Sequence, residues 1–357
     1  MKIAVIGGGI NGVMTAWELC KYGHSVTLFE RHTLISQTSS ASSKLLHGGL
    51  RYLENFEFRL VKEALRERQW WIDQAPHLAQ PIKIFIPIYK QSRRPAWLYK
   101  IGLFLYDLLS GENNIGKHQK YNKVSMQNIC PDLKTDNLVI GFSYYDGQMD
   151  DYRLGLWAAD KVKKYKNFTL LENTLIDKVS VDGEVTYKNS KEKFEKVINI
   201  TGPWASKLLS DNNIKSENRL DLVRGSHIVI SRKLDHGYFL EVPNERRIFF
   251  VLPYQGQTLI GTTEVRQLIS DEIKPTKPEI AYLIDAYNHY FKDEIIEKDV
   301  VKSFSGVRPL IKSANNANKA TRGYAIQVNK DLISIFGGKW TTARQLSYKV
   351  ANLIGRD

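Results

Sequence analysis

Three glycines near the start of the chain, Gly7, Gly9 and Gly12, form a G-x-G-x-x-G pattern. At this spacing the first glycine permits a tight turn, the second lets a pyrophosphate approach a backbone without a Cβ, and the third lets a helix lie close to a strand. Glu30 follows about 20 residues later, where a carboxylate can accept hydrogen bonds from an adenosine ribose. These four residues indicate that the chain binds the ADP half of a dinucleotide.

The elements that must position these residues are short and follow one another in the expected order. Residues 2–6 are an apolar, β-branched run that predicts a buried strand, residues 11–22 have a helical pattern, and residues 25–29 predict a second strand. Gly23 is placed to end the helix. A glycine-rich turn in any α/β protein is the alternative, but the ordered strand, helix, strand and acid favour the dinucleotide. NAD and FAD share the ADP half, so the motif leaves the choice between them open.

The composition is that of an ordinary globular protein with more than one domain. The chain has 357 residues and a mass of 41.0 kDa, with 43% hydrophobic and 25% charged residues, which suits two domains that share an active site. Two cysteines, Cys20 and Cys130, give no disulfide framework and no metal-ligand spacing, so we expect no metal and a reducing cytoplasm. No signal peptide precedes the first strand, and no apolar run reaches the roughly 18 residues of a membrane span.

The formal net charge is +13, which favours an anionic partner. Nucleic acid, the anionic cytoplasmic leaflet of a membrane and phosphorylated substrates all have this chemistry. Much of the charge comes from lysines scattered through surface-like segments such as residues 161–166 and 191–196, so a purely compositional origin is at least an equal alternative. No stacking-aromatic or zinc-finger pattern accompanies the charge, and we therefore expect no nucleic-acid partner.

A serine-rich segment follows the nucleotide motif. Small hydroxyl residues crowd residues 38–43, and His47, Gly48 and Gly49 then interrupt the chain before an amphipathic helix begins after Tyr52. A serine-rich, glycine-broken segment beside a helix suits a flat ring that lies against bare backbone. A flexible surface loop is the alternative interpretation.

The stretch SSKLLHGGLRYLENFEFRLVKEALRER closely resembles the signature of the FAD-dependent glycerol-3-phosphate dehydrogenases and their oxidase relatives. Further blocks resemble the same family, in the family's order, along nearly the whole chain: RPAWLYKIGLFLYDLL, INITGPWA, VRGSHIVI, LIGTTEV, SFSGVRPL and FGGKWTTARQL. The resemblance implies FAD in place of NAD. The helical C-terminal domain that usually continues the family's chain does not follow before Asp357, so the sequence resembles a short form of the family.

The resemblance and the strand pattern together predict an α/β fold with an α+β substrate domain. The expected FAD-binding domain is Rossmann-like, of the D-amino-acid oxidase type, and discontinuous, with residues 1–75, 141–210 and 300–357. The substrate-binding domain is expected to comprise residues 76–140 and 211–299. Within it, GSHIVI, RRIFFVLPY and TLIGTTEV have the length of strands in an antiparallel sheet, and residues 274–291 restore a helical pattern on its outer side.

The FAD site is expected to combine the first glycine motif with later segments. A strand ends at Gly337 and Gly338 in FGGKWTT, and a helix that starts near Thr341 can direct its N-terminus at the flavin pyrimidine oxygens. In KVINITGPW a buried strand breaks at Gly202, which the resemblance places near the dinucleotide. The predicted cofactor residues are Gly7, Gly9, Gly12, Glu30, Ser42, Ser43, Gly48, Gly49, Gly202, Gly337, Gly338 and Thr341.

The reaction that the resemblance implies is oxidation of a secondary alcohol, in which hydride passes from substrate C2 to flavin N5 while a base takes the hydroxyl proton. His47 is the candidate base, because an imidazole titrates near neutral pH and its glycine-rich surroundings permit a close approach to the flavin. A histidine that only hydrogen-bonds the ring or the backbone is the alternative. Arg308 matches the family's active-site arginine, which orients the substrate oxygens and stabilises the developing alkoxide.

A phosphorylated substrate also needs fixed cations that hold its phosphate. Tyr52 is expected to line the same substrate pocket. Gly323 stands where the family tends to have an acid, and Glu264 replaces its usual Asp, so the substrate could have drifted to a related phosphorylated or carboxylated alcohol. An ordinary surface ion pair is the alternative role for any one of the cations. The cations that lie in blocks resembling the family's phosphate-binding positions are Arg51, Arg322 and Lys339.

Residues 91–110 mix basic and apolar side chains, as in a segment that lies on an anionic bilayer surface. A substrate-domain helix with the same face in the core is an almost equal alternative, and the resemblance to a peripheral membrane family favours the membrane only slightly. We therefore predict a cytoplasmic protein, able to lie peripherally on the inner face of the cytoplasmic membrane. It would oxidise sn-glycerol 3-phosphate or a closely related alcohol and pass electrons to quinone.

Two other functions remain open at this point. One is an FAD-dependent oxidase or dehydrogenase of a 2-hydroxy acid or an amino acid, with oxygen as electron acceptor. The other is a non-catalytic flavoprotein that binds a membrane or nucleic acid through a basic face. Steady peroxide release would support the first, and bound FAD that no small alcohol reduces would support the second.

Overall fold

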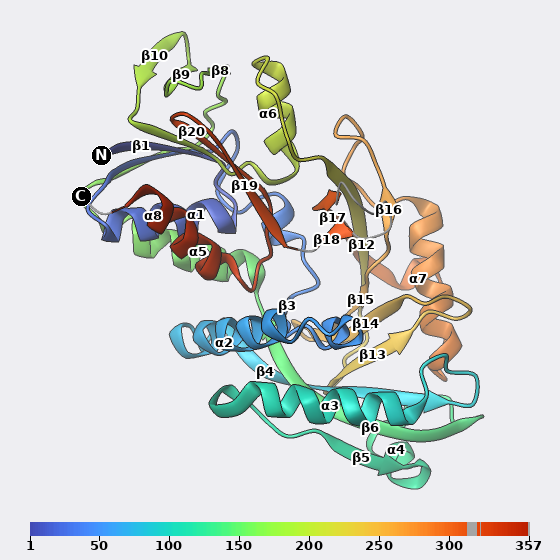
Figure 1. Cartoon of the computed structure of the whole chain (residues 1–357). Coiled ribbons are helices and arrows are strands. Elements are labelled where there is room, and N and C mark those ends of the chain that lie inside the picture. Colours follow the sequence, from blue (N-terminus) through green and yellow to red (C-terminus); the bar gives the residue numbers. More distant parts are fainter. Residues whose placement is uncertain (313–319, 322, 356–357) are drawn as a thin grey trace.

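The half of the molecule that contains the glycine motif is a sheet of six strands with three helices against one face (Figure 1). The computed structural model describes residues 1–312, 320–321 and 323–355. The strands of this sheet, in spatial order, are β19 (Tyr324–Asn329), β20 (Leu332–Gly337), β11 (Lys196–Asn199), β1 (Lys2–Ile6), β2 (Ser25–Phe29) and β7 (Phe168–Leu171). Only the β19–β20 pair is antiparallel. The three helices are α1 (Ile10–Lys21), α5 (Asp151–Val162) and α8 (Ala343–Ile354).

The strand, helix and second strand predicted from the first thirty residues are confirmed. β1 and β2 are parallel, with Ile6 opposite Phe29, so their carboxyl ends meet at one edge of the sheet. Gly7 and Glu30 directly follow these ends and therefore share that edge. Helix α1 ends before Gly23, whose φ of +92° lies in the left-handed region that glycine adopts readily.

The second half is organised around an eleven-stranded, largely antiparallel sheet. Its continuous path runs through β18 (Ala320–Thr321), β17 (Val300–Lys312), β12 (Leu220–Ile230), β15 (Gln257–Gly261), β14 (Ile248–Tyr254), β13 (Gly237–Glu241), β4 (Ala79–Tyr89), β6 (Leu138–Met149) and β3 (Leu45–Leu46). Two short strands lie off this path, β16 (Val265–Arg266) beside β12 and β5 (Gln119–Asn122) beside β6. The three runs predicted to form an antiparallel sheet supply β12, β14 and β15, which confirms that prediction.

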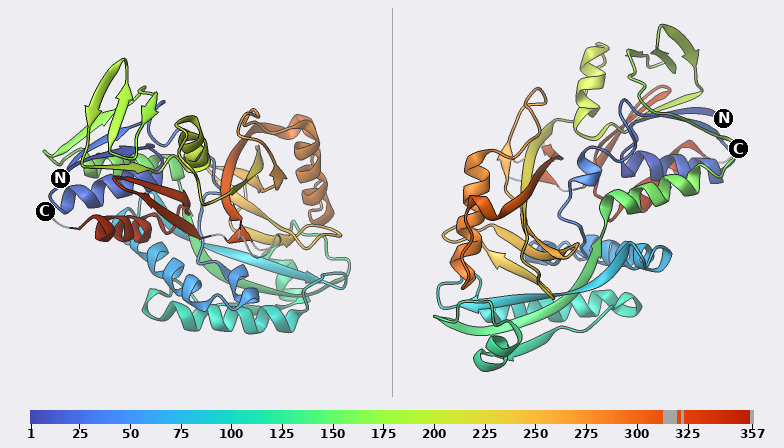
Figure 2. Two further views of the ribbon diagram at one scale, coloured as in Figure 1. Left: turned by 45° about the horizontal axis from the view of Figure 1, so that its top comes forward. Right: turned by 180° about the vertical axis from the view of Figure 1, so that it is seen from behind.

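Helices cover the large sheet on its outer sides. Helices α2 (Phe58–Gln74) and α3 (Ala96–Ser110) lie side by side and both contact β6 (Figures 1 and 2). Helix α7 (Lys277–Tyr290) packs against β12 and β15 on the outer side, as the pattern of residues 274–291 predicts. The helix expected after Tyr52 begins later, at Phe58, because the 3-10 helix η2 (Leu50–Asn55) comes first.

The remaining elements are short. They are α4 (Lys123–Ile129), α6 (Ala205–Asp211), the 3-10 helices η1 (Thr38–Ser40), η3 (Gly111–Asn113), η4 (Gly202–Trp204) and η5 (Glu297–Asp299), and a separate three-stranded sheet of β8 (Lys178–Val179), β9 (Glu184–Tyr187) and β10 (Ser190–Lys193). Within the described residues, no helix is both long and apolar enough to cross a membrane.

The chain passes several times between the two halves. The domain boundaries predicted at residues 75, 141, 210 and 300 stay a prediction. Two strands show how the large sheet crosses those boundaries. β17 begins at Val300 and pairs along its length with β12, and most of β6 lies beyond residue 141 while pairing with β4. Both strands therefore belong to the large sheet, although most of their residues fall in ranges predicted for the FAD-binding domain.

Candidate functional site

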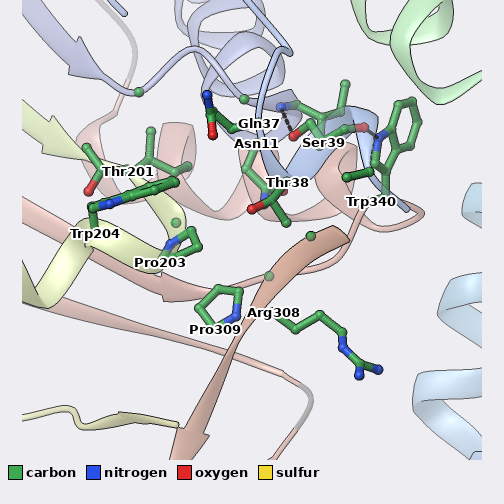
Figure 3. Close-up of a pocket in the computed structure, with 18 of the residues that line it drawn as sticks. Asn11, Gln37, Thr38, Ser39, Thr201, Pro203, Trp204, Arg308, Pro309 and Trp340 are labelled. Carbon is green, nitrogen blue, oxygen red and sulfur yellow. Dashed lines mark hydrogen bonds between the residues drawn. The ribbon is translucent and has the colours of Figure 1, made fainter. Parts of the chain in front are cut away.

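A cavity of about 450 Å³ lies between the two halves of the molecule. One side consists of the turns that follow β1, β2, β11 and β20, and another consists of residues of β12 and β17 in the large sheet. A pocket at the carboxyl ends of parallel strands, with polar groups converging on it, is where an α/β fold of this kind binds its ligands. Figure 3 shows side chains from both halves around this space.

The glycine motif forms one end of the cavity with bare backbone. Gly7 has φ +116°, and a Cβ there would lie 2.7 Å from the carbonyl oxygen of Ile200. A Cβ on Gly12 would lie 1.8 Å from the carbonyl oxygen of Gly7, so only glycine lets α1 start this close to β1. Gly7 and Gly9 line the cavity, whereas Gly12 acts behind it by permitting the helix–strand contact.

Glu30 lines the cavity at the same end and is held by two backbone amides. Gly8 N donates to its Oε2 at 2.7 Å, and His32 N donates to its Oε1 at 2.8 Å. A carboxylate has about four acceptor positions, so both oxygens can still accept a hydrogen bond from a ribose hydroxyl. Next to Glu30, the Arg31 guanidinium lies 4.2 Å from the ring centroid of Trp204, and both line the cavity.

The lining of the cavity includes a buried polar atom for which the described residues supply no hydrogen-bond partner. The Oδ1 atom of Asn11 is buried and accepts no hydrogen bond from the described residues, and Asn11 lines the cavity. A buried acceptor without a donor is costly, so the site suits a ligand that brings hydroxyl or amide donors. Gly338 faces Asn11 so closely that a Cβ on it would lie 2.8 Å from Asn11 Nδ2. These residues fit an extended, hydroxyl-rich dinucleotide.

The turn after β20 behaves largely as the sequence predicts. Gly337 and Gly338 have φ values of +79° and +97°, and both line the cavity together with Thr341. Helix α8 begins at Ala343, two residues later than the start predicted near Thr341. Its N-terminus still follows the turn directly, and Ala343 N donates there to the carbonyl oxygen of Trp340 at 3.2 Å.

The other end of the cavity collects the residues predicted to contact substrate. His47, Tyr52, Arg308 and Lys339 all line it, although they come from three separate segments, of which one contains both His47 and Tyr52. The ammonium of Lys339 lies 4.4 Å from the ring centroid of Tyr52, and the rings of His47 and Tyr52 are 6.3 Å apart. A fixed cation, an arginine and an imidazole in one polar pocket can bind an anionic group and handle a hydroxyl proton.

Arg308 is oriented by the turn after β15. Its Nη2 donates to the carbonyl oxygen of Thr263 at 3.2 Å, and its Nη1 contacts Glu264 Oε1 at 3.4 Å. Glu264, where the resemblance leads us to expect Asp, therefore lies beside Arg308, the predicted active-site arginine. Figure 3 shows the Arg308 side chain extending away from Asn11, Thr201 and Trp204.

Some predicted site residues lie outside the lining of the cavity as far as the structure describes it. Arg51 lies in η2 and does not line it, and Gly49, with φ +80°, packs against the ring of Tyr52. Gly48 packs away from the cavity, because a Cβ there would lie 2.3 Å from Leu65 Cδ2, and its N–H donates to Asp146 at 2.9 Å. Their roles toward ligand stay predictions.

Two further predicted positions need separate comment. Gly202 lines the cavity at the start of η4, in keeping with its predicted place near the dinucleotide. Arg322, predicted to bind phosphate, lies outside the described residues. Its role therefore also stays a prediction.

The two serines predicted to bind the cofactor line the cavity and are held from behind. Ser42 donates through its N and Oγ to Asp151 Oδ2, at 3.0 and 2.7 Å. The other oxygen of Asp151 binds the ammonium of Lys44 at 2.6 Å, in an ion pair that is almost fully buried. Lys44 also donates to the carbonyl oxygen of Ser40 at 2.7 Å, so the pair fixes the whole serine-rich loop.

His227 is a site residue that the sequence analysis missed. It lies on β12, lines the cavity, is buried, and its Nε2 lies 2.9 Å from Ser43 Oγ. Burial lowers the pKa of His227 to about 3, and the positive charges of Lys44 and Arg308 contribute to the same effect. The imidazole is therefore neutral at physiological pH. The sequence feature that could have indicated His227 is a polar histidine inside the strand run VRGSHIVI. The strand pattern alone does not connect this histidine with Ser43.

Other lining residues carry no motif of their own. Ser39 accepts a hydrogen bond from Ile10 N at 3.0 Å through its Oγ, and its carbonyl oxygen accepts one from Trp340 Nε1 at 2.9 Å. The serine thus connects the start of α1 to the turn before α8 (Figure 3). A sequence read segment by segment gives no sign of this contact between residues about three hundred positions apart.

Comparison with known proteins identifies the family. Residues 2–337 match the DAO family of FAD dependent oxidoreductases. The aerobic glycerol-3-phosphate dehydrogenase of Escherichia coli is 36% identical over 97% of this chain and 71% of its own length. The D-erythritol 1-phosphate dehydrogenase of Brucella abortus is 37% identical, covering 96% of this chain and 71% of its own length.

A solved structure agrees with this family in its fold. The glycerol-3-phosphate dehydrogenase of Bacillus halodurans complexed with FAD has a TM-score of 0.78 at 24% identity, covering 99% of this chain and 64% of that one. The prediction of FAD over NAD is confirmed by the family. The chain therefore belongs to the DAO family of FAD-dependent oxidoreductases.

Proposed function

We propose that this protein is an FAD-dependent dehydrogenase that oxidises sn-glycerol 3-phosphate, or a closely related polyol phosphate, to the ketone. The observation that carries the proposal is that Arg308, Lys339, Tyr52 and His47 line the same cavity as the glycine motif, with Lys339 and His47 both near the ring of Tyr52. This arrangement supports the proposal of an anion-binding group, an oxygen-orienting arginine and a proton acceptor in one pocket. The similarity to dehydrogenases of glycerol 3-phosphate and D-erythritol 1-phosphate supports the same substrate class.

FAD, when bound, supplies the hydride acceptor, N5 of its flavin ring. The chain's own residues provide the remaining chemistry. Lys339, with Arg51 and Arg322 as further proposed contacts, would hold the substrate phosphate. Arg308 would orient the C2 oxygen and stabilise the negative charge that grows on it as the proton leaves.

His47 is the proposed base for the hydroxyl proton. It lines the cavity, and its ring lies 6.3 Å from that of Tyr52. His227 is unsuited to the role of base, because its pKa is lowered to about 3, mainly by burial. We therefore assign His227 a role as a neutral hydrogen-bonding partner of Ser43 and not as the base.

The direct test is anaerobic titration of the purified flavoprotein with candidate substrates. We expect the visible flavin band to bleach with sn-glycerol 3-phosphate or D-erythritol 1-phosphate, and not with lactate, 2-hydroxyglutarate or D-amino acids. Bleaching by a hydroxy or amino acid instead would leave the cofactor in place and refute the substrate class. Bound flavin that no alcohol reduces would indicate a non-catalytic flavoprotein.

We further propose quinone as the electron acceptor. The expected result is turnover with a short-chain quinone under anaerobic conditions at a higher rate than with air alone. Steady release of hydrogen peroxide in air, at the rate of substrate oxidation and without any quinone requirement, would identify oxygen as the acceptor and refute this part of the proposal.

The surface of α3 supports a peripheral place on a membrane. Its side chains at spacings of four, three and four residues, Trp97, Ile101, Phe104 and Leu108, are between 50% and 65% exposed, so they form an uncovered apolar stripe on one helix. Lys100 lies in the same helix and is exposed, and the whole chain carries a net charge of +13. An apolar stripe with an exposed lysine in the same helix suits the surface of an anionic bilayer.

Vesicle binding tests this membrane proposal. We expect the protein to sediment with vesicles that contain an anionic phospholipid, and much less with purely zwitterionic vesicles. The paired change Trp97→Ser and Phe104→Ser should abolish sedimentation, whereas the matched control Leu268→Ser, at another exposed leucine, should not. Equal sedimentation of the pair variant would refute the proposal. A change from dimer to monomer in that variant would instead assign the stripe to a second copy of the chain.

A further inference from the structure

Five of the chain's seven tryptophans form one connected group, which we call the tryptophan chain. It begins at Trp340, which lines the FAD cavity, and continues to the fully buried Trp71 at a centroid distance of 5.0 Å. The next contacts are Trp71–Trp70 at 4.8 Å, Trp71–Trp157 at 6.3 Å, Trp70–Trp17 at 6.3 Å and Trp157–Trp17 at 6.1 Å. Trp17, Trp70 and Trp157 are only partly buried.

The members of the tryptophan chain come from separate elements. Trp17 lies on α1, Trp70 and Trp71 on α2, Trp157 on α5, and Trp340 in the turn before α8. Packing of a core explains why large apolar side chains gather between these helices. It does not require that every contact be made by indole, or that the series run without interruption from the cofactor cavity to partly exposed positions. Indole is among the most easily oxidised side chains, and contacting indoles can exchange single electrons.

The hydrogen bonds of the indole N–H groups differ between the inner and outer members. Trp340 Nε1 donates to the carbonyl oxygen of Ser39 at 2.9 Å, and Trp71 Nε1 donates to that of Thr341 at 3.1 Å. An amide carbonyl is too weak a base to take the proton, so an oxidised inner indole keeps it and remains a strong electron acceptor.

The outer members have a different environment. Within the described part of the chain, the Nε1 atoms of Trp17, Trp70 and Trp157 make no hydrogen bond to another residue, and these partly exposed rings can reach water. The ammonium of Lys21 lies 4.5 Å from the ring of Trp17, and that of Lys161 lies 4.9 Å from the ring of Trp157. A nearby cation disfavours a positive charge on the ring and so favours loss of its N–H proton to solvent.

We propose that the tryptophan chain conducts single electrons from the protein surface to an oxidant in the FAD cavity. Trp340 gives one electron to the oxidant, Trp71 restores Trp340, and an outer indole restores Trp71. The outer indole, now lacking one electron, releases its Nε1 proton to water. A thiol reductant then returns one electron and one proton to it and becomes a thiyl radical, and two thiyl radicals formed in this way combine into one disulfide.

Photoexcited FAD is a suitable oxidant for the test, because light starts the electron transfer at a defined time and no substrate is needed. The purified flavoprotein would be illuminated with blue light under anaerobic conditions, without thiol and then with dithiothreitol. Transient absorption and electron spin resonance would detect tryptophan radicals. We expect a long-lived neutral tryptophan radical without thiol, and faster decay of that radical when dithiothreitol is present.

Conservative Trp→Phe changes identify the path. Trp340→Phe and Trp71→Phe should each remove the long-lived radical, while Trp97→Phe, on the exposed face of α3, should leave it unchanged. Trp204 also lines the cavity, on the side away from Trp340 (Figure 3). The variant Trp204→Phe therefore tests whether Trp204 gives the electron in place of Trp340. Thermal unfolding and the flavin-to-protein ratio check that each variant is folded and loaded.

The outcomes separate the proposal from its alternatives. An unchanged yield and lifetime of the radical in Trp71→Phe would refute it, and so would loss of the radical in Trp204→Phe with the radical retained in Trp340→Phe. If Trp71→Phe does not fold, Trp340→Phe decides alone, because it interrupts the first step at a partly exposed position. None of these readouts depends on which alcohol the protein oxidises.

Discussion

The two ends of the cavity differ in how far backbone and side chains contribute to the lining. At the end with the glycine motif the wall includes bare backbone, with Gly7 and Gly9 at the surface and Gly12 behind them, and Glu30 is held there by two amide groups. At the substrate end the wall consists of side chains from segments far apart in the sequence, among them Arg308 on β17. The difference teaches that a backbone site is encoded in one short stretch, whereas a side-chain site depends on how distant strands meet.

The largest effect is expected from a change at the backbone end. In Gly12→Ala the new Cβ would lie 1.8 Å from the carbonyl oxygen of Gly7, so α1 must move away from β1. Overpacking of this kind costs on the order of 3 kcal/mol or more, and we expect the purified variant to contain no FAD. The measurements are the flavin-to-protein absorbance ratio and the thermal unfolding midpoint.

A matched control exists in α3. Nothing lies within 4 Å of a Cβ built on Gly102, so Gly102→Ala should retain FAD and gain up to about 1 kcal/mol from helix propensity. A Gly12→Ala protein that binds FAD as tightly as the parent would show that the dinucleotide does not rely on this motif.

The second largest effect is expected at the side-chain end. Arg308→Ala should lower kcat/KM for the phosphorylated substrate by roughly 10²–10³-fold, because it removes the side chain that we propose as a donor to the developing negative charge. The flavin content should not change, since the cofactor end is intact. Arg266→Ala is the control, because that guanidinium is exposed and pairs with Asp221 at 3.0 Å. Unchanged kinetics in Arg308→Ala would place the substrate elsewhere.

The same contrast explains how much could be predicted from the sequence. The β1–α1–β2 unit follows from apolar periodicity and glycine spacing within thirty residues, and the structure places its helix within one residue of the prediction. Arg308 and Lys339 could be named only through resemblance to a family. Nothing in their local sequence indicates that β17 and the turn after β20 face the same cavity.

His227 shows why the remainder was missed. Its strand was predicted correctly, but its partner Ser43 lies 184 positions earlier, and the contact forms only when the serine-rich loop packs against β12. Alternation along a strand gives the face on which a histidine lies, and not the residue that it meets. The late start of α2 has a similar cause, since the 3-10 turn of η2 is fixed by packing around Tyr52 and Leu53.

A smaller effect is expected behind Arg308, at Glu279. This buried carboxylate on α7 accepts hydrogen bonds at 2.7 Å from Thr263 Oγ1 and Ser226 Oγ, and Thr263 in turn holds Arg308 through its carbonyl oxygen. Burial by itself would raise the pKa of Glu279, but hydrogen bonds from Ser226, Thr263 and Arg224 outweigh it and lower the pKa to about 2. The ionised group therefore stabilises the fold.

The sign of the pH dependence follows from this lowered pKa. The stabilisation is complete above the ordinary pKa of 4.5 and is lost as the pH falls from there toward about 2. Glu279→Gln should cost on the order of 3 kcal/mol in the free energy of unfolding at pH 7, and the gap to the parent should narrow as the pH falls below about 4.5. Urea unfolding of both proteins at several pH values measures this difference in the free energy of unfolding.

The control for Glu279 is a surface carboxylate. Glu294→Gln removes an exposed ion pair with Lys134 and should change stability by less than about 1 kcal/mol at any pH. A gap between Glu279→Gln and the parent that stays constant down to pH 2 would mean that the carboxylate is not preferentially ionised in the folded state.

The smallest effect is expected where the two ends meet, at the 2.9 Å contact between Ser43 Oγ and His227 Nε2. Ser43→Ala removes one hydrogen bond and should cost about 1 kcal/mol in the free energy of unfolding, measured with urea at a fixed excess of FAD. Burial, more than this bond, lowers the pKa of His227, so the variant should show no new histidine titration between pH 5 and 8 in its NMR spectrum. Ser216→Ala, which removes a hydrogen bond to Asn218 in a surface loop, should cost less. A histidine that titrates near pH 6 only in Ser43→Ala would show that the serine keeps the ring neutral, and that the backbone end controls the side-chain end directly.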